Sequence, residues 1–225
     1  MDHPGDVPRK QPAGRPRAGR ASIARLPQYL RFLRDAEAAE HHYLSGTRIA
    51  AALKIEPAQV RKDLAVTGIT SRTGVGFCTS ELIYAIEQYL GWNNTNDAFL
   101  VGAGHLGAAL AGYAGFQRYG LNIVAVFDVD DRKAGRKLCG KPVFPFDQIV
   151  AKAQEMHVHM GIITVPSGAA QDVANVLVLA GIRAIWDFTP VELDVPPNVV
   201  VEKTDLAASL AVLSRRLADA LRPNR

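Results

Sequence analysis

The sequence predicts an α/β fold class in two parts, an N-terminal winged helix-turn-helix and a C-terminal Rossmann-like parallel sheet. Three observations predict it. Apolar residues recur at helical spacings between residues 22 and 66, ahead of a glycine-rich segment. Apolar, β-prone runs alternate with helical stretches from residue 98 onward. A Gly-x-Gly-x-x-Gly sequence directly follows the first of those runs.

Length and composition indicate a folded chain outside the membrane. The 225 residues are 48% hydrophobic, enough for one large domain or two modest ones. No uncharged apolar run reaches the roughly 18 residues of a transmembrane helix, and no apolar stretch follows the basic N-terminus as in a secretory signal. Cys78 and Cys139 are too few and too far apart for a disulfide scaffold or a metal site. We therefore expect a cytoplasmic protein.

Positive charge is concentrated at the N-terminal end. Residues 1–20 carry five basic and two acidic side chains, residues 21–80 carry eight and five, and the remainder carries 13 and 15. This asymmetry favours a polyanionic partner for the first 80 residues. Residues 1–20 are rich in Pro, Gly and Arg with few large apolar side chains, which predicts a disordered basic tail.

The next segment is typical of three helices and a hairpin. We expect helices at residues 22–40, with Ser22 as N-cap, at 47–53, and from Pro57 to about Val66. Residues 68–77 place two short β-prone pieces around turn glycines, which fits a small hairpin. This is the winged helix-turn-helix plan. Residues 80–90 are expected to form a connecting helix, and residues 91–96 a turn-rich boundary.

From residue 97 the pattern is that of a parallel sheet with crossover helices. The expected strands are 98–101, 122–127, 161–165 and 184–187, with 142–144 and 198–202 as additional candidates, and the expected helices are 106–118, 147–156 and 168–180. A last helix at 205–221 carries a leucine stripe that predicts a dimer contact. The predicted domains are thus the tail (1–20), the DNA-binding domain (21–80), a linker helix and turn (81–96), the nucleotide-binding domain (97–204) and a C-terminal dimerisation helix (205–225).

The glycine fingerprint predicts a dinucleotide site. It follows a strand and opens a helix, the context that gives an otherwise weak motif its meaning. Gly102 permits the tight turn, Gly104 lets the backbone approach the pyrophosphate, and Gly107 lets the helix pack on the strand. The phosphates are expected at the helix N-terminus. The motif comprises Gly102, Ala103, Gly104, His105, Leu106 and Gly107.

Asp128 ends the next expected strand and predicts which dinucleotide binds. A carboxylate there accepts hydrogen bonds from both adenosine ribose hydroxyls and repels a 2′-phosphate, so we expect NAD(H) and not NADP(H). The alternative is a Rossmann-like domain for another ligand, such as coenzyme A or S-adenosylmethionine. A coenzyme-A-binding subunit would ignore DNA.

The sequence does not favour an enzyme. A dehydrogenase needs an acid or base beside the nicotinamide and a substrate domain, and no second domain follows the nucleotide-binding one. His105 lies in the fingerprint, and His157 and His159 are expected on a surface loop. His41 and His42 lie between helices and do not indicate a metal site. A small NAD-dependent oxidoreductase stays as an alternative, which turnover without DNA would identify.

The helix that begins at Pro57 is the candidate DNA-recognition helix. Val60 and Leu64 would face the core, which leaves Gln59, Arg61 and Lys62 projecting outward near its N-terminus. Gln suits adenine, and Arg or Lys suits guanine or phosphate. Arg72, at the expected hairpin tip, would reach phosphate or the minor groove. The alternatives are a small helical domain with a solvated basic face, or a plain dinucleotide-binding scaffold.

With both halves considered, the chain resembles the Rex family of bacterial redox-sensing repressors from about Ser22 to Leu221. The resemblance rests on a set of motifs in one order. These are Arg25-Leu-Pro-Gln-Tyr-Leu-Arg31, Gln59-Val-Arg-Lys-Asp-Leu64, Arg72-Thr-Gly-Val-Gly-Phe77, the fingerprint followed by Tyr113-Ala-Gly-Phe116, Phe127-Asp-Val-Asp130, Thr164-Val-Pro166 and Asp187-Phe-Thr-Pro190.

The resemblance implies a homodimer with an exchanged C-terminal helix, which binds an inverted-repeat operator when NAD⁺ prevails and releases it when NADH binds. It adds Thr164, Val165 and Pro166 to the cofactor site, and implies an interdomain hydrogen-bonded switch formed by Arg31, Tyr113 and Asp205. Leu206 would border the partner's nicotinamide. Ala65-Val-Thr67 and Asp187 depart from the family pattern. The first change would alter operator preference, and the second would place a negative charge near the nucleotide pocket.

Overall fold

The computed structural model describes residues 19–93 and 96–222, which form two compact units that divide between Asn93 and Asn94. Each unit has its own apolar core. The expected tail lies outside the described residues up to residue 18, and its last two residues, Gly19 and Arg20, belong to the start of the first helix. Among the described residues, no helix is long and apolar enough to cross a membrane.

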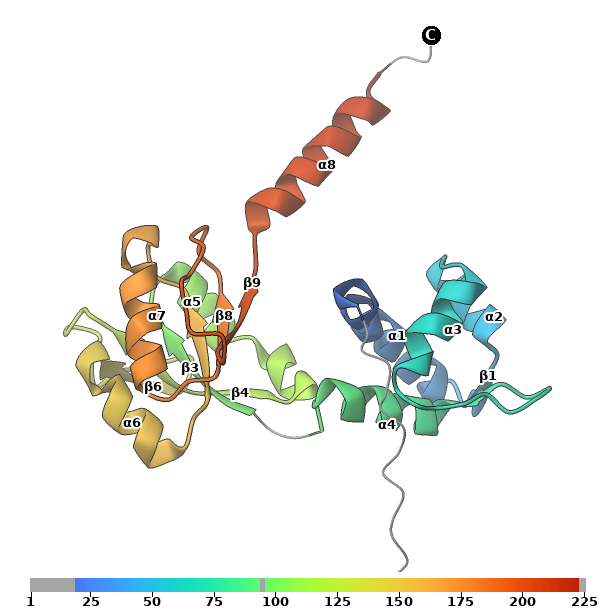
Figure 1. The fold of residues 1–225 in the computed structure, drawn as a ribbon, viewed down its shortest axis with the longest axis horizontal. Helices are drawn as coiled ribbons and strands as arrows, with labels where there is room; N and C mark the ends of the chain where they lie inside the picture. Colours follow the sequence, from blue (N-terminus) through green and yellow to red (C-terminus); the bar gives the residue numbers. More distant parts are fainter. Residues whose placement is uncertain (1–18, 94–95, 223–225) are drawn as a thin grey trace, which may run out of the picture. The chain divides into compact units, whose positions relative to one another are not determined.

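The first unit is built from four helices and a two-stranded sheet (Figure 1). The helices are α1 (Arg20–Ala38), α2 (Gly46–Leu53), α3 (Pro57–Ala65) and α4 (Thr79–Leu90). β1 (Tyr43–Leu44) pairs antiparallel with β2 (Phe77–Cys78). Leu26, Leu30 and Leu33 of α1 are buried with Val60 and Leu64 of α3, as their spacing predicts, whereas Ile23, at the start of the same apolar stripe, is exposed.

The N-terminal ends of the first three helices differ in how well they match the sequence predictions. Ser22 was predicted as the N-cap of α1, and this prediction is wrong: Gly19 occupies that position and Ser22 is buried inside the first turn. Ser45 caps α2, where its hydroxyl accepts a hydrogen bond of 3.1 Å from the Arg48 backbone N–H. Pro57 begins α3 as predicted, since proline needs no N–H partner at the first position.

The wing is a minimal hairpin closed by one antiparallel bridge, and it lies within residues 68–77, where a small hairpin was predicted. Arg72 and Gly76 form the bridge, and residues 73–75 make the tip. The following strand, Phe77–Cys78, pairs with Tyr43–Leu44 and not with the residues before the turn. The physical reason is that Phe77 is buried in the core of the first unit, which fixes its strand beside β1.

The second unit contains a seven-stranded sheet in the order β5-β6-β4-β3-β7-β8-β9. Six strands are parallel and their chain order across the sheet is 3-2-1-4-5-6, the Rossmann arrangement, with β5 antiparallel at one edge. The strands are β3 (Asn96–Val101), β4 (Leu121–Asp128), β5 (Lys137–Leu138), β6 (Lys141–Pro145), β7 (Met160–Ile163), β8 (Ala184–Asp187) and β9 (Val200–Lys203).

Helices cover both faces of this sheet (Figure 1). α6 (Ile149–Met156) and α7 (Ala170–Leu179) pack on the cluster around Phe99 and Phe127, while α5 (His105–Ala111) packs on the opposite cluster around Leu100. Short 3₁₀ segments η2 (Phe146–Gln148) and η3 (Ser167–Ala169) precede α6 and α7.

The helix predicted at 106–118 is interrupted. α5 ends at Ala111, Tyr113 is extended, and a 3₁₀ segment η1 (Ala114–Tyr119) follows. Gly112 and Gly115 explain the break, because glycine stabilises a helix interior poorly. The consequence is that Tyr113 lies in a bend directly after the fingerprint helix.

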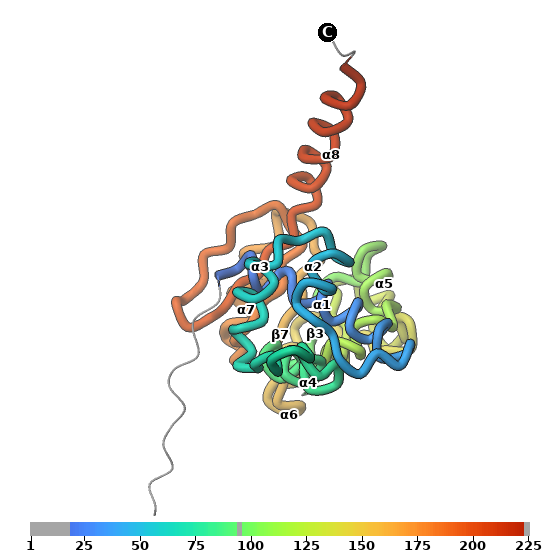
Figure 2. The backbone as a smooth tube through the Cα atoms, turned by 90° about the vertical axis from the view of Figure 1, so that its right-hand side faces the viewer, coloured from blue at the N-terminus to red at the C-terminus, as the bar shows by residue number. Residues whose placement is uncertain are grey.

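The last helix, α8 (Leu206–Ala220), extends away from the sheet (Figures 1 and 2). All of its side chains are exposed, and its leucine stripe is between 57% and 73% exposed at each position. A contiguous apolar face of this kind marks an interaction surface. The stripe consists of Leu206, Leu210, Leu213 and Leu217, continued by Leu221.

Candidate functional site

The fingerprint turn lies where the strand order of the sheet reverses, between β3 and β7. Gly102 follows β3 with φ +106°, and its backbone N–H donates to Phe127 O on β4 at 2.8 Å. A Cβ at this position would lie 2.7 Å from Thr164 O on the neighbouring strand's end. Thr164 in turn donates its hydroxyl to Val101 O and Gly102 O, each at 3.0 Å. This crevice is where open α/β sheets bind ligands.

The other two fingerprint glycines differ in what surrounds them. A Cβ on Gly107 would lie 1.9 Å from Gly102 O, so only glycine lets α5 approach the turn. No protein atom lies within 4 Å of a Cβ placed on Gly104. The chain's own packing therefore does not require glycine there, whereas a bound pyrophosphate would. This open space at the start of α5 fits a dinucleotide.

A pocket of about 330 Å³ opens beside this turn. Its walls are mostly apolar, and its charged lining comes from Asp128 and Lys133. Narrow apolar walls with few polar groups are typical of cofactor sites. The lining residues are Val101, Gly102, Gly104, Asp128, Val129, Lys133, Phe146, Thr164, Val165, Pro166, Ala169 and Val173.

Asp128 is the polar centre of the pocket and is already engaged by three donors. Its Oδ2 accepts from the Ala103 N–H at 2.7 Å and from Lys133 Nζ at 2.9 Å, and its Oδ1 accepts from the Asp130 N–H at 2.8 Å. Burial acts to raise the pKa of the Asp128 carboxyl, but the hydrogen bonds from Lys133 and the two backbone groups outweigh it and lower the pKa. The carboxylate is thus held ionised.

This geometry refines the expectation for the ribose. A carboxylate offers about four acceptor positions, and three are occupied, so one position on Oδ1 is left for a hydroxyl. The sequence reasoning had assigned both ribose hydroxyls to Asp128. It also missed Lys133, although a lysine five residues after the strand-ending acid was a readable signal for an ion pair.

The predicted cofactor residues occupy distinct places around the pocket. Six of them line it, namely Gly102, Gly104, Asp128, Thr164, Val165 and Pro166. Ala103 contributes its N–H to Asp128. His105 and Leu106 are exposed in the first turn of α5, and Gly107 is buried against the turn.

A second cluster of polar groups lies within the first unit and was not predicted. Asp63 on α3 is fully buried, and its two carboxylate oxygens accept from Arg25 Nε and Nη2 at 2.6 and 2.7 Å. The Tyr29 hydroxyl and Gln59 Nε2 donate to the same carboxylate at 2.8 and 2.7 Å. Arg25 and Tyr29, both within the motif Arg25-Leu-Pro-Gln-Tyr-Leu-Arg31, therefore hold α3 in position against α1.

The cluster shifts the ionisation of its members in a consistent direction. Burial alone would raise the pKa of Asp63, but the donors around it, chiefly Arg25, hold the pKa at about 2. Burial, together with the hydrogen bond to Asp63, raises the pKa of Tyr29. Asp63 is thus a permanent anion inside the first unit at neutral pH.

The side chains predicted to read DNA differ in exposure and in the hydrogen bonds they already make. Arg61 and Lys62 are exposed on α3 as expected. Gln59 is half-buried, and one N–H of its amide is committed to Asp63, which leaves the second N–H as a donor and the amide oxygen as an acceptor for a base. Arg61 also lines a polar groove of about 340 Å³ together with residues 45–47 and 71–77, so α3, the start of α2 and the wing share one surface.

Arg72 was predicted at the tip of the wing, and this is wrong. It lies at the base of the turn, and its side chain folds back over Tyr43, with 5.6 Å between the guanidinium carbon and the ring centroid. Its Nη2 pairs with Glu81 at 3.1 Å, and both side chains are more than half exposed. The reason is that the antiparallel bridge uses Arg72 itself, which moves the tip to residues 73–75.

The three predicted switch residues are distributed over both units. Arg31 is exposed on α1 of the first unit. In the second unit, Tyr113 is exposed after α5, and Asp205 is the N-cap of α8, where its carboxylate accepts from the Ala207 and Ala208 N–H groups at 2.8 and 3.1 Å. Leu206 begins the exposed stripe of α8.

Asp187, expected near the nucleotide pocket, lies at the carboxyl end of β8 beside Ile163 of β7 and does not itself line the pocket. It is fully buried at the end of β8, and its carboxylate accepts from the backbone N–H and the hydroxyl of Thr189. It shapes the chain after β8 and does not line the pocket.

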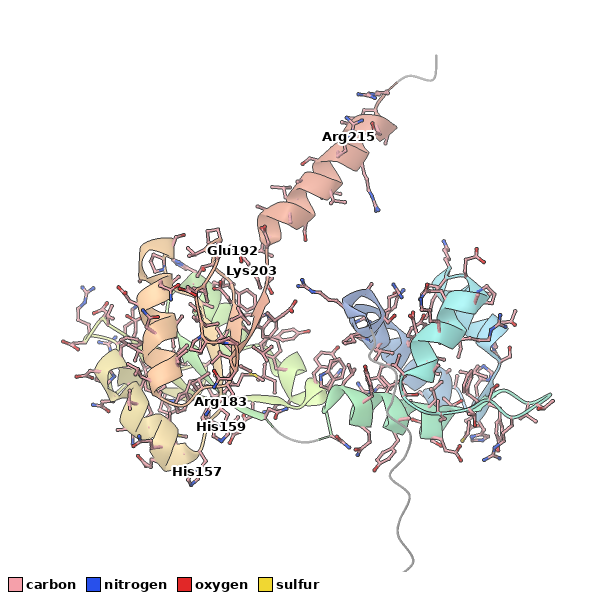
Figure 3. All side chains as sticks on the ribbon, viewed as in Figure 1. His157, His159, Arg183, Glu192, Lys203 and Arg215 are labelled. Atoms are coloured by element: carbon pink, nitrogen blue, oxygen red, sulfur yellow. The ribbon has the colours of Figure 1, made fainter. Side chains whose placement is uncertain are left out.

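The histidines lie apart from the crevice. His157 and His159 are exposed at the amino end of β7, while Lys203 marks the carboxyl edge of the sheet, where the fingerprint lies (Figure 3). His41 contacts Arg48 in the first unit, at 2.9 Å between Nε2 and Nη2. Within residues 19–93 and 96–222, no group of three or more His, Cys, Asp or Glu side chains is arranged to hold a metal ion.

Known families match both units. A family model described as a putative DNA-binding protein N-terminus matches residues 19–65, and one described as a CoA binding domain matches residues 93–191. Among curated proteins, the redox-sensing transcriptional repressor Rex of Treponema denticola is 48% identical over 192 residues, which cover 85% of this chain and 91% of that protein. The protein of the same name from Bacteroides fragilis is 41% identical over 87% of this chain and 89% of its own length.

Solved structures resemble the whole fold. The structure of RSP in complex with β-NAD⁺ and operator DNA has a TM-score of 0.86 at 32% identity, covering 91% of this chain and 94% of that one. The structure of RSP in complex with β-NADH has a TM-score of 0.81 at 31% identity, covering 90% and 95% of the two chains.

Proposed function

This chain belongs to the Rex family of redox-sensing transcriptional repressors. From that premise we propose that its first unit binds DNA and its second unit binds the nucleotide that controls DNA binding. The protein is a repressor that senses the ratio of NADH to NAD⁺. It binds operator DNA when NAD⁺ prevails and releases the DNA when NADH binds, and it is not an enzyme. Its cofactor is NAD(H), and it works as a homodimer on double-stranded DNA in the cytoplasm.

The observation that carries this function is one chain with two surfaces of different chemistry, a mostly apolar pocket around an ionised carboxylate and a basic helix face. The second unit has an open glycine turn beside an ionised Asp128, which suits a pyrophosphate and a free ribose. The first unit has exposed Arg61 and Lys62 on a helix whose opposite side is locked by Asp63, which suits the phosphates and base edges of DNA.

We assign the cofactor site to the fingerprint residues 102–107 with Asp128 and the segment 164–166. Gly104 leaves room for the pyrophosphate, and Asp128 accepts from one ribose hydroxyl at its remaining position. Bound NAD(H) supplies no bond-making chemistry here. Its reduced and oxidised forms differ by a hydride and a positive charge at the nicotinamide, and the protein responds only to their different affinities for its two arrangements.

We assign the DNA surface to Gln59, Arg61 and Lys62 on α3, with Arg72 at the base of the wing. Gln59 would read a base through its amide oxygen and its second N–H, since one N–H is committed to Asp63. Arg72 would first leave its exposed pair with Glu81, which costs little because such pairs contribute at most about 1 kcal/mol. In a two-fold dimer the two α3 helices require an inverted-repeat operator.

The switch is assigned to Arg31, Tyr113 and Asp205, as the family resemblance implies. Two features of the structure support it. Tyr113 directly follows the fingerprint helix, and Asp205 directly precedes the helix with the exposed leucine stripe. Both residues are exposed, and Arg31 is exposed as well, so all three are accessible to form new hydrogen bonds.

Fluorescence anisotropy of a labelled DNA fragment from the gene's upstream region tests the function. The protein is added first, and NADH, NAD⁺, NADPH or coenzyme A is then titrated. Release by NADH and far weaker release by NAD⁺ are expected. Release by coenzyme A alone would favour a coenzyme-A-binding regulator, which the family description of residues 93–191 makes a necessary comparison. Binding of NADH with no effect on DNA from several promoters would overturn the repressor function.

The DNA contacts are tested by salt dependence. If Arg61 contacts a phosphate, Arg61→Gln lowers the slope of log affinity against log salt by about 1. Arg118→Gln removes an exposed positive charge from the second unit and serves as the matched control, for which the slope should not change.

A further inference from the structure

Aromatic rings make continuous contact between the segment after α5 and the end of β8. The ring centroids of Tyr113 and Phe116 are 4.9 Å apart, and those of Phe116 and Trp186 are 5.6 Å apart, both in edge-to-face geometry. Phe188 also packs on Trp186, with 4.8 Å between the centroids. Edge-to-face pairs add a preferred geometry to apolar burial, so a displacement of one ring disturbs its contact with the next.

Tyr113 connects this row of rings to the nucleotide fingerprint. α5 has seven residues, of which the first three, His105, Leu106 and Gly107, belong to the fingerprint. The Tyr113 backbone N–H donates to Leu110 O at 3.1 Å just beyond the end of the helix. The tyrosine ring lies directly over Gly115, where a Cβ would come within 2.5 Å of it. A shift of α5 on nucleotide binding would therefore be transmitted to the ring of Tyr113.

Trp186 connects the same row of rings to the start of α8. Its indole Nε1–H donates to Thr204 Oγ1 at 2.8 Å, and the backbone N–H of Thr204 donates to Asp187 O at 2.8 Å. The next residue, Asp205, caps α8. Thr204 is thus held to β8 by both its side chain and its backbone, directly before the helix begins.

The connection matters because nothing else in the described part of the second unit holds α8. All side chains of α8 are exposed, and its leucine stripe has no cover within the chain. The direction in which α8 leaves the sheet is therefore set by the few residues between β9 and Leu206. Thr204 is the one of them that a side chain of another element binds within residues 96–222.

We propose that Trp186 is a positioning residue that couples the fingerprint helix α5 to the dimer helix α8 through its contact with Phe116 and its hydrogen bond to Thr204. The inference rests on the proposed function, because it names the route by which the bound nucleotide changes the placement of α8. Trp186 touches neither the nucleotide pocket nor the DNA surface. It sets how strongly the two sites are linked.

Two substitutions remove the hydrogen bond, and Thr204→Val does so with the smaller change in packing. Trp186→Phe keeps an aromatic ring against Phe116 and removes the N–H donor, and Thr204→Val removes the acceptor with little change in shape. The quantity measured is the factor by which saturating NADH weakens operator binding by the full-length homodimer. We expect this factor to fall by about fivefold in both variants, the effect of one hydrogen bond of ordinary net strength. NADH affinity without DNA should change by less than about twofold.

Thr204→Ser is the matched control, because it retains the acceptor and should restore the original factor. Equal coupling in Thr204→Val, Trp186→Phe and the unaltered protein would overturn the inference. If the unaltered protein itself binds NADH without releasing DNA, the proposed function fails instead, so the two failures are distinguishable.

A spectroscopic readout separates coupling from mere packing. The chain has two tryptophans, so Trp92→Phe leaves the Trp186 indole as a single ¹⁵N–¹H resonance in the labelled protein. We expect this resonance to differ between the NAD⁺-bound and NADH-bound forms and the difference to shrink in Thr204→Val. A purely structural hydrogen bond would give the same resonance in both forms, and that result would overturn the proposal.

Discussion

The guanidinium of Arg25 holds both carboxylate oxygens of Asp63, with its Nε and Nη2 at 2.6 and 2.7 Å. The pair joins α1 to α3 across 38 residues of sequence. Asp63 is fully buried while 30% of the Arg25 side chain is exposed, so the arginine covers the anion at the edge of the core. A fork of this kind fixes orientation as well as distance, so it fixes the angle at which α3 presents Arg61 and Lys62.

Asp63→Asn should destabilise the first unit by about 3 kcal/mol, because an amide cannot accept both guanidinium donors and leaves a partly buried charge unpaired. Urea unfolding of the full chain, followed by Trp92 fluorescence in a Trp186→Phe background, measures this, since Trp92 packs on the core of the first unit. Asp35→Asn, on the exposed side of α1, is the control and should change stability by less than about 0.5 kcal/mol. Equal stability of the two variants would contradict the role of the pair.

The same carboxylate predicts how stability depends on pH. Its pKa in the folded protein is about 2, below the ordinary aspartate value of 3.8, so the folded state favours the ionised form. Its contribution, about 2 kcal/mol, is fully present well above pH 3.8 and is lost as the pH falls through 3.8 toward 2. The free energy of unfolding of the first unit should therefore decrease as the pH falls across that window, and Asp63→Asn should flatten the curve of stability against pH there. A curve of the same steepness in Asp63→Asn would assign the acid sensitivity to other carboxylates.

Most of the fold could be predicted because its signals are local. Apolar runs located every parallel strand of the sheet, and the fingerprint located the crevice at the strand-order reversal. The errors occurred where a distant residue decides the outcome. Phe77, at the end of the predicted hairpin segment, pairs with β1 and not with the residues before the turn, because its side chain is buried in the core of the first unit. The break after Ala111 is fixed by two glycines whose effect depends on Tyr113 packing over Gly115.

The sequence predicted where the residues of the nucleotide site lie relative to the strands, but not the charged and hydrogen-bonding partners around them. The positions of Gly102 and Asp128 relative to strands followed from the sequence, but the Lys133 partner and the three donors on Asp128 depend on loop geometry. Likewise, a period of four marks Val60 and Leu64 as core, yet gives no reason to bury Asp63 between them. The buried carboxylate needs a charged partner from another helix, here Arg25, to offset the free-energy cost of removing it from water.

The two fingerprint glycines Gly104 and Gly107 should respond differently to alanine. Gly107→Ala would place a Cβ 1.9 Å from Gly102 O, so the turn must move and the second unit should lose stability, measured as a lower thermal midpoint. Gly104→Ala meets no protein atom within 4 Å and should leave the thermal midpoint unchanged while weakening NADH binding at least about tenfold. Normal NADH affinity in folded Gly104→Ala would mean that the pyrophosphate does not lie there.

Glu81 should restrain Arg72 before DNA binds. The pair is exposed on both sides, so breaking it alters stability little, whereas the freed guanidinium adds a cation to the groove shared by α3 and the wing. Glu81→Gln should therefore tighten operator binding about threefold to tenfold at low salt, with the gain shrinking as salt rises. Anisotropy at several salt concentrations measures it. In Arg72→Gln, the further change Glu81→Gln should bring a smaller gain, and an equal gain would show that Glu81 acts without Arg72.

The pair Asp128–Lys133 should set the choice between NADH and NADPH. Asp128 carries the charge that repels a 2′-phosphate, while Lys133, 2.9 Å from it, is the cation that would attract one if the carboxylate were neutral. Asp128→Asn should thus shift the ratio of NADPH to NADH affinity toward NADPH by roughly tenfold or more, and Lys133→Gln should shift it further toward NADH. Calorimetric titration with both nucleotides measures the ratio, and Lys137→Gln, an exposed lysine on β5, controls for net charge. If Asp128→Asn leaves the ratio unchanged while the thermal midpoint falls, the carboxylate serves to hold the turn through Ala103, and nucleotide choice belongs to another residue.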